Sequence, residues 1–189
     1  FVTYHADSLN LHHVPLALYG AHQTANAALA LKAITLLRNG GLQISDKAIK
    51  RGLKTTHWPG RFQIIQRRST PVMVCDVGHN VGGVKAFADS FQKRFPGRKG
   101  HFVIGLVQKK EHQKIFDVLS SIAASFRLVK LKTRRTADPG ELLKTIDWRG
   151  VPARKVGSLD VAIRSLTKQS APDDIIVVIG SHYLAGEFL

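Results

Sequence analysis

Apolar and polar residues alternate in blocks along the second part of the chain, and the spacing within each block predicts its structure. Residues 72–75 form a short apolar run of strand length. Residues 80–94 carry apolar side chains at the three- and four-residue intervals of an amphipathic helix, namely Val81, Val84, Phe87, Ala88 and Phe91. The segment therefore predicts a buried strand followed by a helix.

The same alternation continues to residue 179. It predicts strands at 102–107, 126–131, 155–156 and 174–179, and helices at 111–123, 141–146 and 159–166. Strands that alternate with helices of this length are typical of βαβ units, whose right-handed crossovers build a mainly parallel sheet. The expected fold class is α/β, with a mainly parallel sheet flanked by helices.

The first part of the chain has a different pattern. An Ala- and Leu-rich helix is predicted at 24–38 and ends at Asn39-Gly40-Gly41, and a second helix is predicted at 45–53 with Ser45 as its N-cap. Trp58-Pro59-Gly60 cannot continue a helix. We therefore expect two domains, 1–57 and 58–189. Because 57 residues are too few for an independent α/β core, the first is expected to complete a domain whose beginning is absent.

Composition narrows the class of protein. Hydrophobic residues make up 44% of the 189 residues, which excludes a disordered basic tail, and no apolar run approaches the ~20 residues of a membrane span. The single cysteine, Cys75, cannot form an internal disulfide. No basic segment followed by an apolar one marks a secretion signal. We therefore expect a cytoplasmic protein. We also expect this chain to be a fragment of a longer one.

The net charge of +15 predicts attraction to anions. The basic residues are scattered, with short clusters only at Arg67-Arg68, Lys109-Lys110 and Arg134-Arg135, and no nucleic-acid-reading pattern accompanies them. We therefore expect neither a nucleic-acid partner nor a membrane partner.

The segment Asp76-Val77-Gly78-His79-Asn80 follows the first strand of the second domain. In parallel sheets, ligands bind at the carboxyl ends of strands, where loops and helix N-termini converge. Asp76 is suited to accept hydrogen bonds from ribose hydroxyls, whereas His79 and Asn80 are suited to donate to phosphate or carboxylate. A structural interpretation remains equally open, in which Asp76 and Asn80 cap the helix and Gly78 shapes the turn.

Two further segments carry candidate chemistry. Gly20-Ala21-His22-Gln23-Thr24-Ala25-Asn26 opens the first helix, where His22 and Gln23 are more often cap-region residues than ligand contacts. Pro59-Gly60-Arg61-Phe62 places Arg61 at the start of an expected strand, where its guanidinium can grip a phosphate.

Other common motifs are missing from the sequence. It contains no Gly-x-x-x-x-Gly-Lys-Ser/Thr phosphate loop, no Gly-x-Gly-x-x-Gly fingerprint and no Cys/His spacing typical of structural zinc. His5, His12 and His13 are expected to be surface or packing residues rather than metal ligands, and no metal site is expected in this chain.

The order of three motifs resembles the folylpolyglutamate synthase/dihydrofolate synthase family of the Mur ligase superfamily. These motifs are Gly20-x-His22-Gln23-x-x-Asn26, then Trp58-Pro59-Gly60-Arg61-Phe62, then Cys75-Asp76-x-Gly78-His79-Asn80. The similarity continues with Val103-Ile104-Gly105-Leu106 before Lys109, and with Gly180-Ser181 after the final strand. It spans nearly the whole chain.

The resemblance implies an ATP-dependent amide ligase that adds L-glutamate to folates, and in a bifunctional version also to dihydropteroate, through an acyl phosphate. It also implies a Rossmann-like C-terminal domain at 58–189, preceded by the end of a central ATP-binding domain. The phosphate loop and the Mg²⁺ ligands of such enzymes belong to the part of the central domain that is missing here.

The resemblance also assigns residue roles. It places His22, Gln23 and Asn26 on the adenine side of ATP, Arg61 on a phosphate, and Asp76 on the ribose, with Asn80 also contacting the nucleotide. His79 and Lys109 take the catalytic positions, and Ser181 lies near the incoming glutamate. These groups are expected to act by position and charge rather than as proton carriers.

One loop departs from the family pattern, because Gln108-Lys109-Lys110 stands where Asp-Lys-Asp is frequent. Two alternatives to folate ligation also remain: a non-catalytic basic module that binds a nucleotide or nucleic acid, and a cell-wall Mur ligase. The pairing of Gly-x-His-Gln with Pro-Gly-Arg favours the folate branch.

Overall fold

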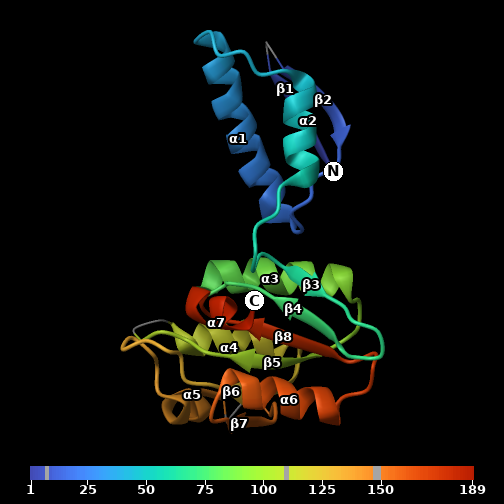
Figure 1. The fold of residues 1–189 in the computed structure, drawn as a ribbon. Coiled ribbons are helices and arrows are strands. Elements are labelled where there is room, and N and C mark those ends of the chain that lie inside the picture. The colour runs from blue at the N-terminus through green and yellow to red at the C-terminus, as the bar shows by residue number, and fades with distance from the viewer. Residues whose placement is uncertain (7–8, 109–110, 147–149) are drawn as a thin grey trace. The chain divides into compact units, whose positions relative to one another are not determined.

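The structure, a computed structural model, describes residues 1–6, 9–108, 111–146 and 150–189 (Figure 1). It divides into two compact units, Phe1–Trp58 and Pro59–Leu189. Lys109, one of the expected catalytic residues, lies outside the described residues. Within the described part, no helix combines the length and apolarity needed to cross a membrane.

The first unit is an antiparallel hairpin packed with two helices. Strands β1 (Val2–Ala6) and β2 (Leu9–Val14) pair with each other, and helices α1 (Ala21–Asn39) and α2 (Asp46–Thr55) follow. Their apolar side chains form a small cluster of their own, made of Val2, Leu9, Leu11, Val14, Leu31 and Ile49. Ser45 caps α2 as predicted, because its side chain accepts a hydrogen bond from the backbone N–H of Ala48. The hairpin was not predicted.

The second unit is built on a six-stranded sheet. Its strands are β3 (Gln63–Ile65), β4 (Val72–Cys75), β5 (Gly100–Ile104), β6 (Ala123–Leu128), β7 (Ala153–Lys155) and β8 (Ile175–Ile179), in the spatial order β3-β4-β8-β5-β6-β7. Only β3 runs antiparallel to its neighbour. Strand β8, the last of the six along the chain, therefore lies between the parallel strands β4 and β5.

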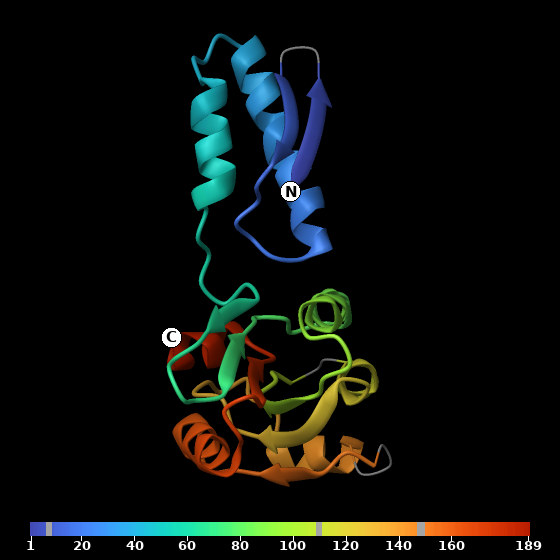
Figure 2. The same cartoon turned by 90° about the vertical axis from the view of Figure 1, so that its right-hand side faces the viewer.

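Helices cover both faces of this sheet. They are α3 (Val81–Arg94), α4 (His112–Ser120), α5 (Pro139–Ile146), α6 (Leu159–Gln169) and α7 (His182–Phe188). Figure 2 shows α3, α4 and α5 on one side of the sheet and α6 and α7 on the other. The mainly parallel α/β fold predicted from the sequence is confirmed.

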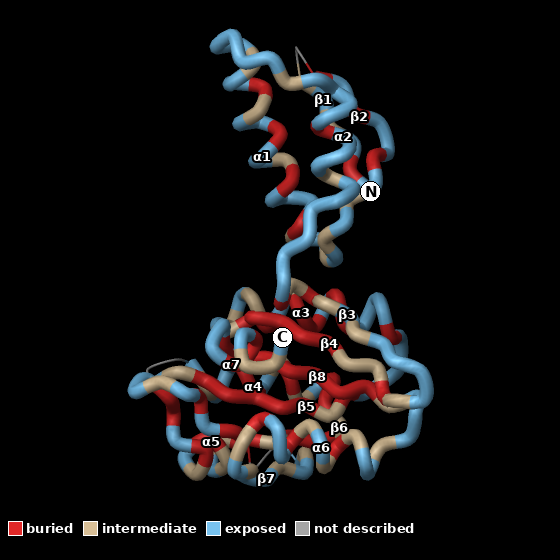
Figure 3. Tube along the Cα trace, in the orientation of Figure 1, coloured by how far each residue is buried: buried red, intermediate tan, exposed pale blue. Residues whose placement is uncertain are grey.

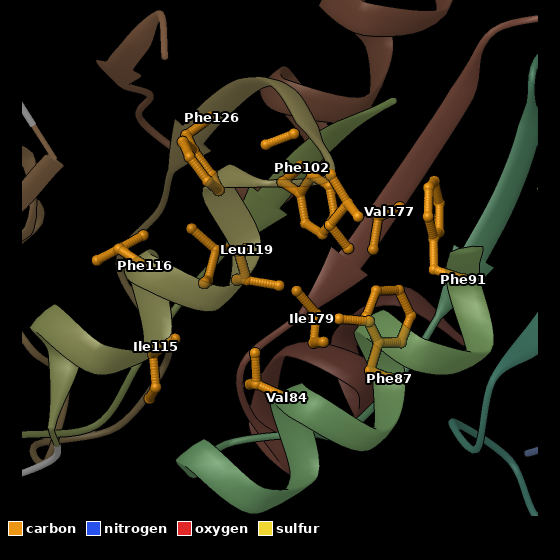
Figure 4. Close-up of a cluster of buried hydrophobic side chains, with 14 of the residues drawn as sticks. Val84, Phe87, Phe91, Phe102, Ile115, Phe116, Leu119, Phe126, Val177 and Ile179 are labelled. Carbon is orange, nitrogen blue, oxygen red and sulfur yellow. The ribbon is translucent and has the colours of Figure 1, made fainter. Parts of the chain in front are cut away.

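Strand β8 shows why the sheet is buried on both faces. Ile175, Val177 and Ile179 pack into the cluster beneath α3, α4 and α5, whereas Ile176 and Val178 pack into the cluster beneath α6 and α7. Because successive side chains of a strand point to opposite faces, a strand covered on both sides must be apolar throughout. Figure 3 shows β8 and β5 as buried strands, and Figure 4 shows the first cluster, where Phe87, Phe91, Phe102 and Val177 meet.

Several predicted boundaries were wrong by a few residues. The strand predicted at 102–107 runs from Gly100 to Ile104, and the one predicted at 126–131 runs from Ala123 to Leu128. The helix predicted at 111–123 ends at Ser120. Apolar residues continue past the ends of these elements, so that periodicity alone does not mark where hydrogen bonding stops.

Candidate functional site

The chain leaves two adjacent strands of the second unit in opposite directions. Strands β4 and β8 are parallel neighbours, with Cys75 opposite Val178, so that their carboxyl ends lie at one edge of the sheet. The chain after β4 enters α3, which packs on one face, and the chain after β8 enters α7, which packs on the other. In open α/β sheets ligands usually bind in a crevice at such a divergence, and this part of the sheet edge is called the crevice below.

Asp76 holds the loop between β4 and α3 in place. Its side chain is buried, and its oxygen Oδ1 accepts a hydrogen bond of 2.7 Å from the backbone N–H of Gly78. Its other oxygen, Oδ2, accepts one of 2.9 Å from the N–H of Phe62. The second contact ties the start of β3 to this edge and brings the neighbouring Arg61 with it.

The turn that follows Asp76 leaves little room for a side chain at Gly78. A Cβ at Gly78 would lie 3.0 Å from Asp76 Oδ1 and 3.3 Å from the carbonyl carbon of Gly83, closer than side-chain carbons normally approach. Asn80 then caps α3, because its side-chain oxygen accepts a hydrogen bond of 2.8 Å from Gly83 N–H. The structural roles weighed for Gly78 and Asn80 are therefore present, while Asp76 braces the loop rather than capping the helix.

Ser181 has a similar role after β8. Its side chain is buried and accepts a hydrogen bond of 3.0 Å from the N–H of Tyr183, which caps α7. The preceding Gly180 has a φ of 120°, a conformation that side-chain-bearing residues rarely adopt.

Two histidines meet across the crevice. The rings of His79 and His182 lie 5.4 Å apart between centroids, at an interplanar angle of 53°. His79 Nδ1 lies 3.0 Å from the carbonyl oxygen of Val77 and must donate to it, since a carbonyl only accepts. Its Nε2 is therefore the ring atom that remains for contact with a ligand.

Burial, together with neighbouring cationic groups, favours the neutral form of His182. Burial lowers its pKa first, the nearby His79 and Arg61 lower it further, and Asp76 opposes them. Arg61, Asp76, His79 and His182 thus form one electrostatic cluster. Sequence reasoning identified the first three and missed His182, although its place directly after Gly180-Ser181 was a signal that could have been used.

The expected adenine-side residues of the first unit form a chain of hydrogen bonds at the start of α1. Asn26 Nδ2 donates to Gln23 Oε1 over 3.0 Å, which orients the buried Gln23 amide so that its Nε2 donates to His22 Nε2 over 3.0 Å. The proton of a neutral His22 is then on Nδ1, a buried atom without a partner in the part of the chain that the structure describes. These three residues belong to the first unit and the cluster at the sheet edge belongs to the second.

The described residues include neither a reactive thiol nor a metal-binding cluster. Burial, with the charge of Asp76, raises the pKa of the Cys75 thiol to about 12, so that it remains an unreactive thiol at neutral pH. Among residues 1–6, 9–108, 111–146 and 150–189, no group of three or more His, Cys, Asp or Glu side chains is placed to hold a metal ion.

Residues 60–182 match the family model of the Mur ligase glutamate ligase domain. The chain belongs to the Mur ligase family. Among solved structures, folylpolyglutamate synthase of Mycobacterium tuberculosis, complexed with ADP and AMPPCP, superimposes on this Mur ligase chain with a TM-score of 0.81 and 27% identity. The family resemblance inferred from the sequence motifs is confirmed.

Three curated relatives extend the comparison. A probable bifunctional folylpolyglutamate synthase/dihydropteroate synthase of Haloferax volcanii is 31% identical over 98% of this chain, and a dihydrofolate synthase/folylpolyglutamate synthase of Bacillus subtilis is 27% identical over 90%. A UDP-N-acetylmuramoyl-L-alanyl-D-glutamate–2,6-diaminopimelate ligase of Corynebacterium efficiens is 30% identical over 93%. The chain spans 21%, 39% and 35% of these relatives and 40% of the M. tuberculosis protein.

Proposed function

We propose that this chain is the C-terminal part of an ATP-dependent ligase that adds L-glutamate to folates, and in a bifunctional form also to dihydropteroate. The observation that carries the proposal is the similarity of nearly the whole chain, at 31% identity, to a relative named as a folylpolyglutamate synthase. The cluster of Arg61, Asp76, His79 and His182 at a sheet edge supports it, because a phosphate-rich ligand needs cationic and hydrogen-bonding groups there. The single buried thiol fits a cytoplasmic protein.

The proposed reaction has two steps. A carboxylate oxygen of the folate attacks the γ-phosphorus of ATP, and ADP leaves with the electron pair of the broken phosphorus–oxygen bond. The amino group of glutamate then attacks the carbonyl carbon of this acyl phosphate. The tetrahedral intermediate loses phosphate and a proton and becomes the amide.

The second unit would bind the nucleotide at the carboxyl edge of β4. Asp76 accepts a backbone hydrogen bond at each of its oxygens, which holds its carboxylate at the edge where a ribose hydroxyl would bind. The Arg61 guanidinium suits two oxygens of one phosphate, and His79 Nε2 faces away from the bond that fixes its ring. Asn80 is the adjacent nucleotide-binding residue in this proposal.

The remaining expected residues complete the proposal. Ser181 keeps its O–H as a donor for the incoming glutamate, because its oxygen already accepts from Tyr183. His22, Gln23 and Asn26 would meet the adenine, with Asn26 exposed at the end of their hydrogen-bonded chain. Lys109 stays a proposed catalytic cation. Mg²⁺ would neutralise phosphate charge, with its ligands supplied by the part of the ligase outside this chain.

The proposal is tested in the full-length protein, meaning this chain with any sequence that precedes Phe1. We expect ATP-dependent incorporation of labelled glutamate into tetrahydrofolate, and we expect Arg61→Lys and His79→Ala to lower kcat while the melting temperature stays close to that of the wild type. Arg61→Lys loses the two-pronged contact, whereas Arg68→Lys on the exposed loop of the same segment serves as the control. Wild-type turnover in both site variants would refute the assignment of this site.

A second candidate function is peptide ligation in cell-wall synthesis, which the 30% identity to the C. efficiens diaminopimelate ligase favours. The same assay separates the two when it is run with each amino acid and its acceptor. Incorporation of diaminopimelate into a UDP-linked muramoyl peptide, without incorporation of glutamate into folate, would replace the folate proposal.

A further inference from the structure

A charged side chain interrupts the apolar face of the sheet that lies beneath α6. Val103, Ile176 and Val178 of this face pack with Leu159, Ala162 and Leu166 of α6. Arg127 on β6 stands directly opposite Val103 on β5. Because partners in a parallel ladder direct their side chains to the same face, Arg127 emerges beside this apolar cluster.

A second arginine stands on the other side of Arg127. The register of β6 and β7 pairs Arg127 with Arg154, so that two guanidinium groups occupy neighbouring positions on one face. Arg154 Nη2 donates to Ser165 Oγ of α6 over 3.2 Å. Burial lowers the pKa of Arg127, and the charge of Arg154 lowers it further.

Neither arginine has an acidic partner among the residues that the structure describes. The ion pairs formed among the described residues leave out both Arg127 and Arg154. Arg127 Nη1 donates to two neutral oxygens, Ser125 Oγ and the carbonyl of Phe126, each over 3.3 Å. Its Nε is buried and has no partner among residues that the structure describes.

General features of β-sheets explain the position of Arg154 but not that of Arg127. Basic residues on an edge strand discourage pairing with other chains, which accounts for Arg154 on the edge strand β7. Arg127 lies on β6, which is paired on both sides, and a long stem that packs on apolar surface normally carries its charged head into water. A partly buried guanidinium beside a second one is instead unfavourable unless an anion compensates the charge.

We propose that Arg127 and Arg154 form a binding site for a phosphate group, either inorganic phosphate or a phosphate ester. The planar forks of two arginines suit tetrahedral oxyanions, and an oxyanion held between them compensates their two like charges. Ser125 holds the site, since its hydroxyl contacts both Arg127 and His101 Nδ1, the latter at 2.8 Å.

The site is separate from the proposed nucleotide crevice. β6 is the third strand from β4 in the sheet, so that about 14 Å separates them at a strand spacing of about 4.8 Å. The proposal concerns a second anion site and stands or falls independently of the ligase activity.

The direct test is a nuclear magnetic resonance titration of the arginine Nε–Hε signals in the 189-residue chain. Inorganic phosphate is added in one arm and phenyl phosphate in another, both against sodium chloride at equal ionic strength. We expect a saturable shift of the Arg127 Nε–Hε signal with inorganic phosphate, and with phenyl phosphate as well if the site is open to esters. The absence of any shift in both arms would overturn the proposal.

Variants supply the second readout. Arg127→Lys keeps the charge but loses the fork, so that phosphate should bind at least about tenfold more weakly. Arg164→Lys is the matched control, because Arg164 is exposed on α6 and pairs with Asp160. His79→Ala, which alters the nucleotide crevice, should leave the Arg127 titration unchanged.

Thermal melts show whether phosphate stabilises the folded chain and whether Arg127 destabilises it without phosphate. Phosphate at ten times its Kd should raise the melting temperature of the wild type by about 3–5 °C. In Arg127→Met this rise should vanish, and without phosphate the variant should melt no lower than the wild type, because it has lost an uncompensated charge. A phosphate response retained in Arg127→Met, or a variant that melts far below the wild type in chloride alone, would contradict the proposal.

Discussion

At the scale of single residues, Asp76 has a structural role in addition to the proposed ribose contact. Asp76→Ala would leave the N–H groups of Phe62 and Gly78 without their acceptor at the crevice. We expect a loss of about 2–4 kcal/mol in the free energy of unfolding of the 189-residue chain, measured by urea denaturation. Asp76→Asn keeps one carbonyl oxygen as an acceptor and should recover part of the loss. Equal stability of the alanine variant and the wild type would show that these two bonds do not stabilise the loop.

The lowered pKa of His182 predicts how the stability of the chain depends on pH. The pKa of His182 is lowered in the folded chain, so the unfolded chain takes up a proton first as the pH falls through about 6.5. The contribution of His182 to stability is therefore complete above that pH and declines below it. A titration followed by nuclear magnetic resonance should place the His182 pKa below 6.5, and His79→Gln should raise it. A His182 pKa at or above 6.5 in the wild type would contradict the environment described here.

At the scale of elements, the junction of β8 and α7 depends on Gly180. Its φ is 120°, and a Cβ there would lie 2.6 Å from the carbonyl oxygen of Gly105. Gly180→Ala should reduce the stability of the chain by about 2–4 kcal/mol, as judged from denaturation curves. Gly186→Ala is a control within α7, because a Cβ at that position meets no atom within 4 Å. It should stabilise the chain by about 0.5–1 kcal/mol through helix propensity.

The elements also show which features a single sequence reveals. Residues 175–179 are all apolar and could be predicted as a strand buried on both faces. The boundary between α4 and β6 was not predictable in the same way, since Ile122-Ala123-Ala124 continues the apolar pattern without a glycine or proline. The hairpin of β1 and β2 was missed because its strands mix apolar with polar residues and carry histidines at exposed positions.

The candidate site was likewise only partly predictable from the sequence. The Asp76–Asn80 loop could be found because its polar residues and glycine follow a strand. The meeting of His79 with His182 could not, because it depends on β8 lying beside β4, and strand order is a tertiary property that local pattern does not encode. The neighbouring positions of Arg127 and Arg154 could not be predicted either, because they arise from the register of β6 with β7.

At the scale of the whole molecule, each unit has its own apolar cluster. The large clusters of the second unit lie within residues 59–189, and the small cluster of the first unit lies within residues 1–58. Residues 59–189 expressed alone should therefore fold and unfold in one cooperative transition, whereas residues 1–58 alone should be only marginally stable. Circular dichroism melts of the two pieces check this prediction. A piece 59–189 without a cooperative transition would show that its core needs the first unit.

The 189-residue chain should have no ligase activity by itself. Its sequence contains no phosphate loop, and the described residues contain no cluster of metal ligands. Glutamate incorporation is measured with ATP, Mg²⁺ and tetrahydrofolate. Activity in the purified chain would mean that its own residues suffice for phosphoryl transfer.

The position of β8 has a consequence for synthesis on the ribosome. Val72 of β4 pairs with Ile175 of β8, and β8 also pairs with β5, so that the centre of the sheet is filled by the last of its six strands to be translated. Until then β4 and β5 each present an unpaired edge in the nascent chain, which is the kind of surface that invites aggregation. Completion of this core therefore waits for long-range pairing after the other five strands have been translated. A chain truncated before residue 175 would hold two half-sheets with no central strand to join them.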